Sequence, residues 1–188
     1  MDRRSLLRRA AAGLVVAACG PTAKAPSAIA GGTNTATPSS TPGASSATTG
    51  SKATVALAKG GSFTFTLRAD KAPQTVARFI GKAKSGFYDN LNFHRVEDWV
   101  VQGGDPSGNG TGGGRVPSEY NDLTFAIGAM GIARGQDPAF NNDSQFFIVL
   151  KDSAFLDKQY TNFGQVISGM DVVRGIKIGD KIKTIKIE

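Results

Sequence analysis

Residues 53–68 read ATVALAKGGSFTFTLR, and this stretch indicates how the folded part of the chain is built. Every second residue over 63–67 is apolar, which is the period of a strand that buries one face. Gly60-Gly61 separates this strand from another over 53–58, and a glycine pair suits the tight turn of an antiparallel hairpin. The sequence therefore predicts a β-hairpin at the start of the folded domain.

A helix is predicted directly after the hairpin. Pro73 suits the first turn of a helix, and Gly86 suits its end. Between them, apolar residues recur at helical spacing and form one stripe: Val76, Phe79, Ile80 and Ala83. This stripe predicts a helix that packs one face against a core.

The rest of the chain reads as short elements. Strands are predicted over 91–96, 99–102, 124–127, 129–133, 144–150 and 162–167, followed by a short helix over 170–174 and a closing strand that includes 185–188. Many short strands with two helices favour a mainly β fold, a closed β-barrel with helices over its ends.

The N-terminal residues 1–18 have the pattern of a signal peptide. A basic segment over 1–9 precedes an apolar segment over 10–18, which is too short for a permanent membrane span. Val16-Ala17-Ala18-Cys19 resembles a bacterial lipobox, in which the chain is cut before the cysteine and the thiol carries diacylglycerol. The alternative is an ordinary buried cysteine in an N-terminal helix.

Three segments follow from this interpretation: a signal peptide over 1–18, a lipidated Cys19 with a tether over 19–51, and a folded domain over 52–188. The tether is rich in Ser, Thr, Pro, Ala and Gly, which cannot bury enough apolar area to fold, and it would span about 30 Å on average. We therefore expect an exported, extracytoplasmic lipoprotein anchored in a membrane through Cys19 only. Arg3-Arg4 also resembles a twin-arginine export signal, although arginine pairs are common in such basic segments.

Composition excludes several functions. The 188 residues contain one Cys and one His, so an intramolecular disulfide framework and most zinc sites are excluded. The net charge of +7 is concentrated in part in the arginines of the signal peptide, and it does not indicate nucleic-acid binding. No metal and no cofactor are expected.

Four motifs follow one another in the second half of the chain. They are Phe93-His94-Arg95, Gln102-Gly103-Gly104-Asp105, Gly110-Thr111-Gly112-Gly113 and Ser144-Gln145-Phe146-Phe147. In this order and spacing they resemble the cyclophilin family of peptidyl-prolyl cis-trans isomerases, over essentially all of 52–188. The resemblance implies an eight-stranded antiparallel β-barrel capped by two α-helices.

The resemblance also implies an active site. Rotation about an Xaa-Pro bond has a barrier of about 18–20 kcal/mol and requires no nucleophile or cofactor. Arg95 would stabilise the twisted amide, since a guanidinium offers several fixed donors, and Gln102 would act beside it as a second catalytic residue. Phe146 and Phe147 are adjacent on a strand, so one must face the core and the other the groove. The implied substrate-binding residues are Trp99, Val100, Gly110, Ala133, Arg134, Gln145, Phe147, Phe155, Leu156 and Tyr160.

Several positions depart from the family pattern. Glu97-Asp98 stands where Pro-Gly is usual, and these acids are close enough in sequence to pair with Arg95. Trp99 stands where Phe is usual, and Tyr160 where many members have His. Phe155 replaces the Trp of cyclosporin-sensitive members, which implies low sensitivity to that drug.

Two rival sites receive little support. The glycine run over 108–113 matches GxGxxG, but no helical pattern follows it, as dinucleotide binding requires. His94 has neither a second His nor a GxSxG motif with which to form a hydrolase site, so a packed strand histidine is the simpler interpretation.

The predicted function is therefore isomerisation of Xaa-Pro bonds in exported polypeptides. The alternative is a non-catalytic module or chaperone that binds proline-containing peptides and has lost the catalytic rate. The expected partners are proline-containing polypeptides and, through the lipid anchor, a membrane. Nucleic acid is not expected, and the chain is expected to be monomeric.

Overall fold

The computed structural model describes residues 50–188. The predictions for the signal peptide, Cys19 and most of the tether lie outside the described residues. In chain order the elements are β1 Lys52–Leu57, β2 Ser62–Leu67, α1 Pro73–Lys84, β3 Phe93–Val96, β4 Val100–Gly103, β5 Arg115–Pro117, β6 Ala129–Arg134, β7 Phe140–Val149, the 3₁₀ turn η1 Ala154–Leu156, β8 Asn162–Ser168, α2 Met170–Arg174 and β9 Ile182–Ile187.

The predicted hairpin is confirmed. β1 and β2 pair antiparallel, with Val55 opposite Phe63, and both strands bury every second residue. Gly60 and Gly61 in the connection have φ values of 96° and 84°, in the left-handed region that glycine adopts without strain. The buried faces of the two strands supply one wall of the core.

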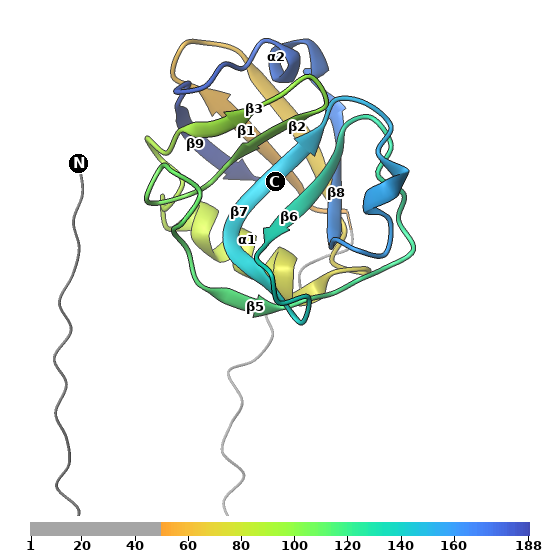
Figure 1. Ribbon diagram of the computed structural model, residues 1–188. Coiled ribbons are helices and arrows are strands. Elements are labelled where there is room, and N and C mark those ends of the chain that lie inside the picture. The colour runs from red at the N-terminus through yellow and green to blue at the C-terminus, as the bar shows by residue number, and fades with distance from the viewer. Residues whose placement is uncertain (1–49) are drawn as a thin grey trace, which may run out of the picture. The chain divides into compact units, whose positions relative to one another are not determined.

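The strands form one curled antiparallel sheet in the order β3-β4-β7-β6-β8-β2-β1-β9, and β5 pairs with β7 beside this path (Figure 1). The terminal strands β3 and β9 meet where each begins: Asn92 and Lys181 form an isolated bridge, and the N–H of Ile182 donates to the carbonyl of Leu91 at 2.9 Å. The mainly β, eight-stranded architecture with two helices is thus confirmed. The sheet is curled into a half-barrel: this bridge joins the starts of β3 and β9, and no ladder joins these two strands in the described structure.

One strand prediction is wrong and one strand was not predicted. Residues 124–127 form no strand, because their N–H groups bond to side chains: Phe125 donates to the Asp157 carboxylate at 2.8 Å and Ile127 to that of Asp152 at 3.0 Å. β5 has only three residues and ends in a proline, so it carries no periodic signal.

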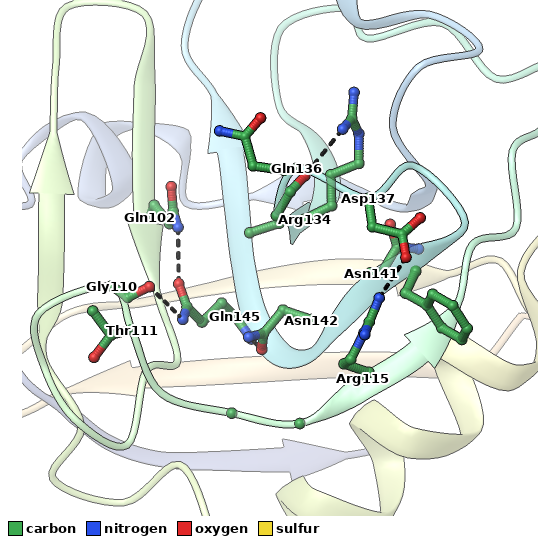
Figure 2. Close-up of a pocket in the computed structure, with 15 residues that line it drawn as sticks. Gln102, Gly110, Thr111, Arg115, Arg134, Gln136, Asp137, Asn141, Asn142 and Gln145 are labelled. Atoms are coloured by element: carbon green, nitrogen blue, oxygen red, sulfur yellow. Dashed lines mark hydrogen bonds and ion pairs between the residues drawn. The ribbon is translucent and has the colours of Figure 1, made fainter. Parts of the chain in front are cut away.

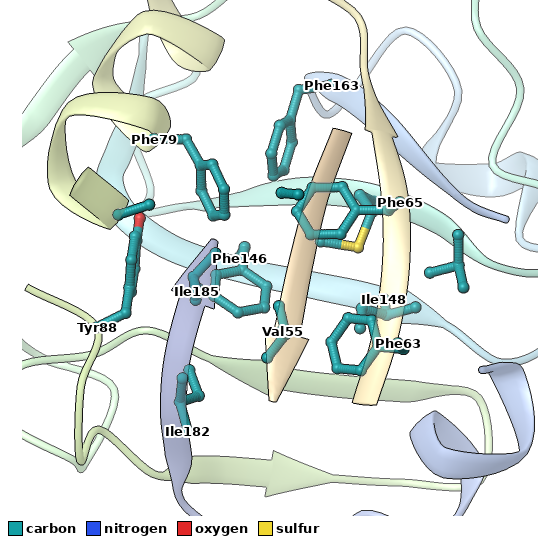
Figure 3. Packing of buried hydrophobic residues seen from close by; sticks show 14 of the residues in the cluster. Val55, Phe63, Phe65, Phe79, Tyr88, Phe146, Ile148, Phe163, Ile182 and Ile185 are labelled. Atoms are coloured by element: carbon teal, nitrogen blue, oxygen red, sulfur yellow. The ribbon is translucent and has the colours of Figure 1, made fainter. Parts of the chain in front are cut away.

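The main core lies inside the curled sheet and under α1 (Figure 3). Phe79 of α1 contacts four aromatic rings, with centroid distances of 5.6 Å to Phe65, 5.2 Å to Tyr88, 5.9 Å to Phe146 and 5.5 Å to Phe163. The predicted apolar stripe of α1 is therefore the face that contacts the sheet. α2 lies at the opposite end of the sheet (Figure 1).

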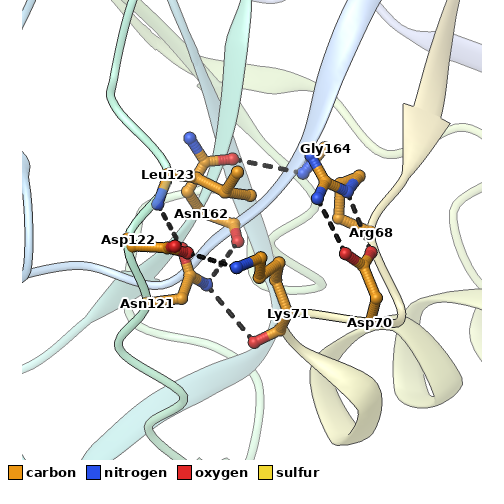
Figure 4. Close-up of polar contacts among 8 residues, drawn as sticks. All are labelled: Arg68, Asp70, Lys71, Asn121, Asp122, Leu123, Asn162 and Gly164. Carbon is orange, nitrogen blue, oxygen red and sulfur yellow. Dashed lines mark hydrogen bonds and ion pairs between the residues drawn. The ribbon is translucent and has the colours of Figure 1, made fainter.

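The segment after β5 is attached to its neighbours by polar contacts (Figure 4). The Asn121 amide donates to the carbonyl of Asn162 at 2.8 Å and to that of Lys71 at 3.4 Å. The Lys71 ammonium pairs with Asp122 at 2.6 Å. These contacts attach the segment to β8 and to the residues just before α1. Phe125, which follows the segment in the chain, belongs to the candidate site.

Candidate active site

The two adjacent phenylalanines of β7 divide the protein into two apolar regions. Phe146 is in the main core, whereas Phe147 is in a second cluster on the other face of the sheet. This confirms that the two rings face opposite sides. The second cluster, called the outer cluster below, consists of Val100, Phe125, Ala129, Phe147, Val149 and Leu156, with Trp99 and Tyr160 packed against it.

The Phe147 ring is held on three sides. It stacks on Phe125 at a centroid distance of 5.7 Å and meets the edge of Tyr160 at 5.7 Å. Its third contact is the backbone of β6, because a Cβ atom at Gly131 would overlap the ring. The sequence did not identify Gly131 or Phe125 as site residues. The sequence around Gly131 does not indicate a role in the site, since that role depends on the position of Gly131 opposite Phe147 on the neighbouring strand.

A row of polar side chains crosses the strands beside the outer cluster. Arg95 lies opposite Gln102 in the β3–β4 register, and its Nη1 donates to Gln102 Oε1 at 3.4 Å. Gln102 donates to Gln145 Oε1 at 3.1 Å, and Gln145 donates to the carbonyls of Gly110 at 3.1 Å and Gly112 at 2.8 Å. Figure 2 shows Gln145 between Gln102 and the glycine loop. The structure thus brings four predicted site residues together.

Of the two acids beside Arg95, only Glu97 contacts it. Glu97 Oε1 accepts from Arg95 Nε at 2.7 Å, and Oε2 accepts from Trp99 Nε1 at 2.8 Å. The hydrogen bond from Arg95, supported by that from Trp99, holds the pKa of Glu97 below its ordinary value. Asp98 instead pairs with Lys151 at 2.6 Å, which lowers the pKa of Asp98.

Aromatic and cationic side chains surround the outer cluster. Trp99 meets the edge of Phe155 at 5.4 Å, and Phe155 is 62% exposed. Arg134 lies over the Tyr160 ring at 4.8 Å and donates to the carbonyl of Gln159 at 3.0 Å. These side chains form a rim around Phe147 and Leu156, which are each 5% exposed.

Next to the rim is a cavity of about 410 Å³ (Figure 2). Of the predicted residues, Gln102, Gly110, Ala133, Arg134 and Gln145 line it. The other predicted residues line no part of this cavity and lie at the outer cluster or its rim: Arg95, Trp99, Val100, Phe147, Phe155, Leu156 and Tyr160. The site therefore has an apolar part, the outer cluster with its rim, and a polar part, the cavity, which Gln102 and Gln145 line.

The glycine loop is held by its own carboxylate. The side chain of Asp105, fully buried, accepts from the N–H groups of Asn109 at 2.8 Å, Gly110 at 2.6 Å, Ser107 at 3.0 Å and Gly112 at 2.9 Å. Since these donors are occupied and no helix follows the loop, the dinucleotide-binding alternative has no structural basis. Burial raises the pKa of Asp105, but the four donors outweigh it and hold the pKa below its ordinary value.

We expect Asp105→Asn to lower the free energy of unfolding by about 3 kcal/mol at pH 7, because an amide oxygen cannot replace a carboxylate that accepts four bonds. A carboxyl group whose pKa is lower in the folded state stabilises the protein above its unfolded pKa of about 4 and loses that contribution as pH falls through the folded value. The difference between wild type and variant should therefore shrink below pH 4. Urea unfolding at pH 7 and pH 3 measures both effects. An equal difference at both pH values would contradict the role of the charge.

His94 is packed between the site and the loop. Neither of its ring nitrogens has a hydrogen-bond partner among the described residues. Burial, with a smaller contribution from Arg95, lowers the pKa of His94 against the opposing effect of Asp105. The packed strand histidine is therefore the interpretation that the structure supports.

Residues 50–188 offer neither a metal site nor a membrane-spanning helix. No group of three or more His, Cys, Asp and Glu side chains there is arranged to hold a metal ion. No helix in the same part of the chain is long and apolar enough to cross a membrane.

A curled antiparallel sheet with two helices is the fold of the cyclophilin-type isomerases. The family model described as cyclophilin type peptidyl-prolyl cis-trans isomerase/CLD matches residues 53–188. Peptidyl-prolyl cis-trans isomerase B of Bacillus subtilis (strain 168) is 40% identical over 138 residues, which covers 70% of this chain and 94% of the relative.

Solved structures agree. A crystal structure of a Cryptosporidium parvum cyclophilin type peptidyl-prolyl cis-trans isomerase matches with a TM-score of 0.68 at 26% identity, covering 74% of this chain and 98% of that one. Another, determined in the presence of the dipeptide Ala-Pro, has a TM-score of 0.66 at the same identity, covering 73% and 98%. The chain belongs to the cyclophilin family. Its activity is peptidyl-prolyl cis-trans isomerisation, a reaction of proline-containing peptides.

Proposed function

We propose that this isomerase acts on exported polypeptides by non-covalent catalysis, with Arg95 stabilising the twisted amide. The observation that carries the mechanism is the position of Arg95, whose guanidinium lies over Trp99 at 5.4 Å beside the outer cluster. A proline ring in contact with Phe147 and Leu156 would place its amide near that guanidinium. No bond is made or broken, so the protein needs only to hold the ring and to donate to the amide as its conjugation is lost.

The two parts of the site would divide the work. Val100, Phe147 and Leu156 would bind the proline ring in the apolar part, while Trp99, Phe155 and Tyr160 form its rim. Gln102 and Gln145 would align the peptide backbone, and Gly110, Ala133 and Arg134 in the cavity would meet neighbouring residues of the peptide. Relaxation of a short Xaa-Pro peptide from cis to trans tests the mechanism, because acceleration that survives Arg95→Ala would contradict it.

The export part of the proposal rests on residues outside those that the structure describes. A basic segment, an apolar segment and Val16-Ala17-Ala18-Cys19 occur in the order of a lipoprotein signal. Lipid on Cys19 would anchor the chain, and the Ser/Thr/Pro-rich tether would hold a monomeric domain away from the membrane. The substrates would then be polypeptides outside the cytoplasm, and Arg3-Arg4 is compatible with export by the twin-arginine route.

We expect Cys19→Ala to move the full-length chain from the membrane fraction to the soluble fraction and to abolish labelling by a radioactive fatty acid. The physical reason is that Cys19 is the single cysteine of the sequence, so no other thiol could carry the diacylglycerol. Isomerase activity is the control, and it should be unchanged. A variant that stays in the membrane fraction, or a wild type that takes up no label, would contradict the anchor. Replacing Arg3-Arg4 by two lysines should block export only if the twin-arginine route is used.

A further inference from the structure

The Glu97 side chain joins Arg95 to the rim. Its two carboxylate oxygens have different partners: Oε1 accepts from Arg95 Nε at 2.7 Å and Oε2 from Trp99 Nε1 at 2.8 Å. Trp99 in turn contacts Phe155 at 5.4 Å. One carboxylate thus sets the orientation of two groups that the substrate would meet.

The backbone holds this carboxylate in place. Glu97 lies in the turn between β3 and β4, and its N–H donates to the carbonyl of Val100 at 2.8 Å, which closes the turn. Arg95 is fixed by the same hairpin, because it pairs with Gln102 across the two strands. Glu97 and its two partners, Arg95 and Trp99, therefore stay close together in the β3–β4 hairpin.

The contacts leave the useful part of the guanidinium open. Glu97 occupies Nε and Gln102 accepts from Nη1, while the Trp99 ring lies against the group at 5.4 Å. Guanidinium has five N–H donors in one plane, so fixing the plane at Nε directs the remaining Nη donors outward. A carboxylate bound to the Nη pair would instead have blocked them.

Glu97 also has an opposing effect, since its negative charge weakens the field of Arg95. That effect is small here, because the two side chains are 45% and 43% exposed and water screens the pair. Orientation has the larger effect, since small displacements of a catalytic group cost large factors in rate. Positioning should therefore outweigh the loss of charge.

We propose that Glu97 is a positioning residue of this isomerase: it orients Arg95 toward the proline amide and holds Trp99 at the rim. The proposal rests on the proposed role of Arg95. It assigns a task to a residue that stands where Pro-Gly is usual in the family pattern.

The test compares Glu97→Ala, Glu97→Gln and Asp98→Asn in the full-length chain. Asp98 is the matched control, because it is an acid in the same turn that pairs with Lys151 and not with Arg95. We expect kcat/KM to fall about tenfold for Glu97→Ala, in the range found for directly contacting residues. Glu97→Gln keeps one acceptor oxygen and should fall about threefold. Asp98→Asn should stay within about twofold of wild type.

Two further readouts separate positioning from a structural role. Trp99 is the only tryptophan, so the fluorescence emission of the protein reports on the Glu97 contact. Glu97→Ala should shift the emission maximum, and Asp98→Asn should not. In an Arg95→Ala background, Glu97→Ala should cause no further loss of kcat, because residues that act as one unit are not additive.

Three results would overturn the proposal. They are a Glu97→Ala variant with higher kcat/KM than wild type, one with unchanged kcat/KM, and an equal loss in Asp98→Asn. The first would show that the charge of Glu97 hinders Arg95 more than its contact helps, and the third would show that the loss does not depend on the contact with Arg95. If Arg95→Ala itself kept full activity, the proposed mechanism would fail, and that outcome is distinct from a failure of Glu97 alone.

Discussion

Arg95→Ala should lower kcat/KM about 100-fold, the loss usual when a donor to a developing charge is removed. In the structure, Arg95 is the cation of the row that includes Gln102 and Gln145, and Trp99 links it to the outer cluster. The uncatalysed relaxation of an Xaa-Pro peptide takes tens of seconds or longer, so the loss is easily measured.

The arginine variant should remain folded, because the Arg95 side chain is 43% exposed and lies outside both apolar clusters. Arg68→Ala is a matched control, since Arg68 also pairs with an acid two residues later, Asp70, at 2.7 Å and lies away from the row. Arg68→Ala should keep wild-type activity. Loss of activity in both variants, or in neither, would contradict a specific role for Arg95. Peptide binding, followed by Trp99 emission, should fall only modestly in Arg95→Ala.

Phe79→Ala should lower the free energy of unfolding by about 3–5 kcal/mol, the range for removing a buried phenylalanine ring. Phe79 is 1% exposed and contacts rings from three strands and from the segment that contains Tyr88. Its removal leaves a cavity between α1 and the sheet that these rings can fill only in part. Urea unfolding, with the slope of the transition compared between variants, measures the loss.

Ile178→Ala is the control for that experiment, because Ile178 is 68% exposed. Its free energy of unfolding should stay within about 0.5 kcal/mol of wild type. A Phe79→Ala loss below about 1 kcal/mol would contradict the packing of α1 described here.

Much of the fold could be predicted, because strong periodicity and buried packing agree along most of the chain. The apolar residues that alternate over 63–67 are buried in the core, and so is Phe79 in the apolar stripe of α1. The prediction failed over 124–127, where an apolar segment has its N–H groups bound by Asp152 and Asp157. Such long-range contacts to side chains leave no trace in local periodicity.

The site was predicted less completely than the fold. The motifs named Arg95, Gln102 and Phe147, and strand alternation placed Phe146 and Phe147 on opposite faces of the sheet. The sequence showed two acids near Arg95, but it did not show which one would pair, because Lys151 is distant in sequence and takes Asp98. Gly131 was missed for the same reason, since its partner lies on another strand.

β9, the last strand in the described structure, completes the sheet, and this determines when the domain can finish folding. β1 pairs along its length with β9, and the bridge at Lys181 joins the start of β9 to the start of β3. During synthesis, therefore, the edges of β1 and β3 stay unpaired until residues 181–187 have left the ribosome. Contacts this distant in sequence slow folding and expose strand edges that can aggregate. Partly made chains would need protection until β9 emerges.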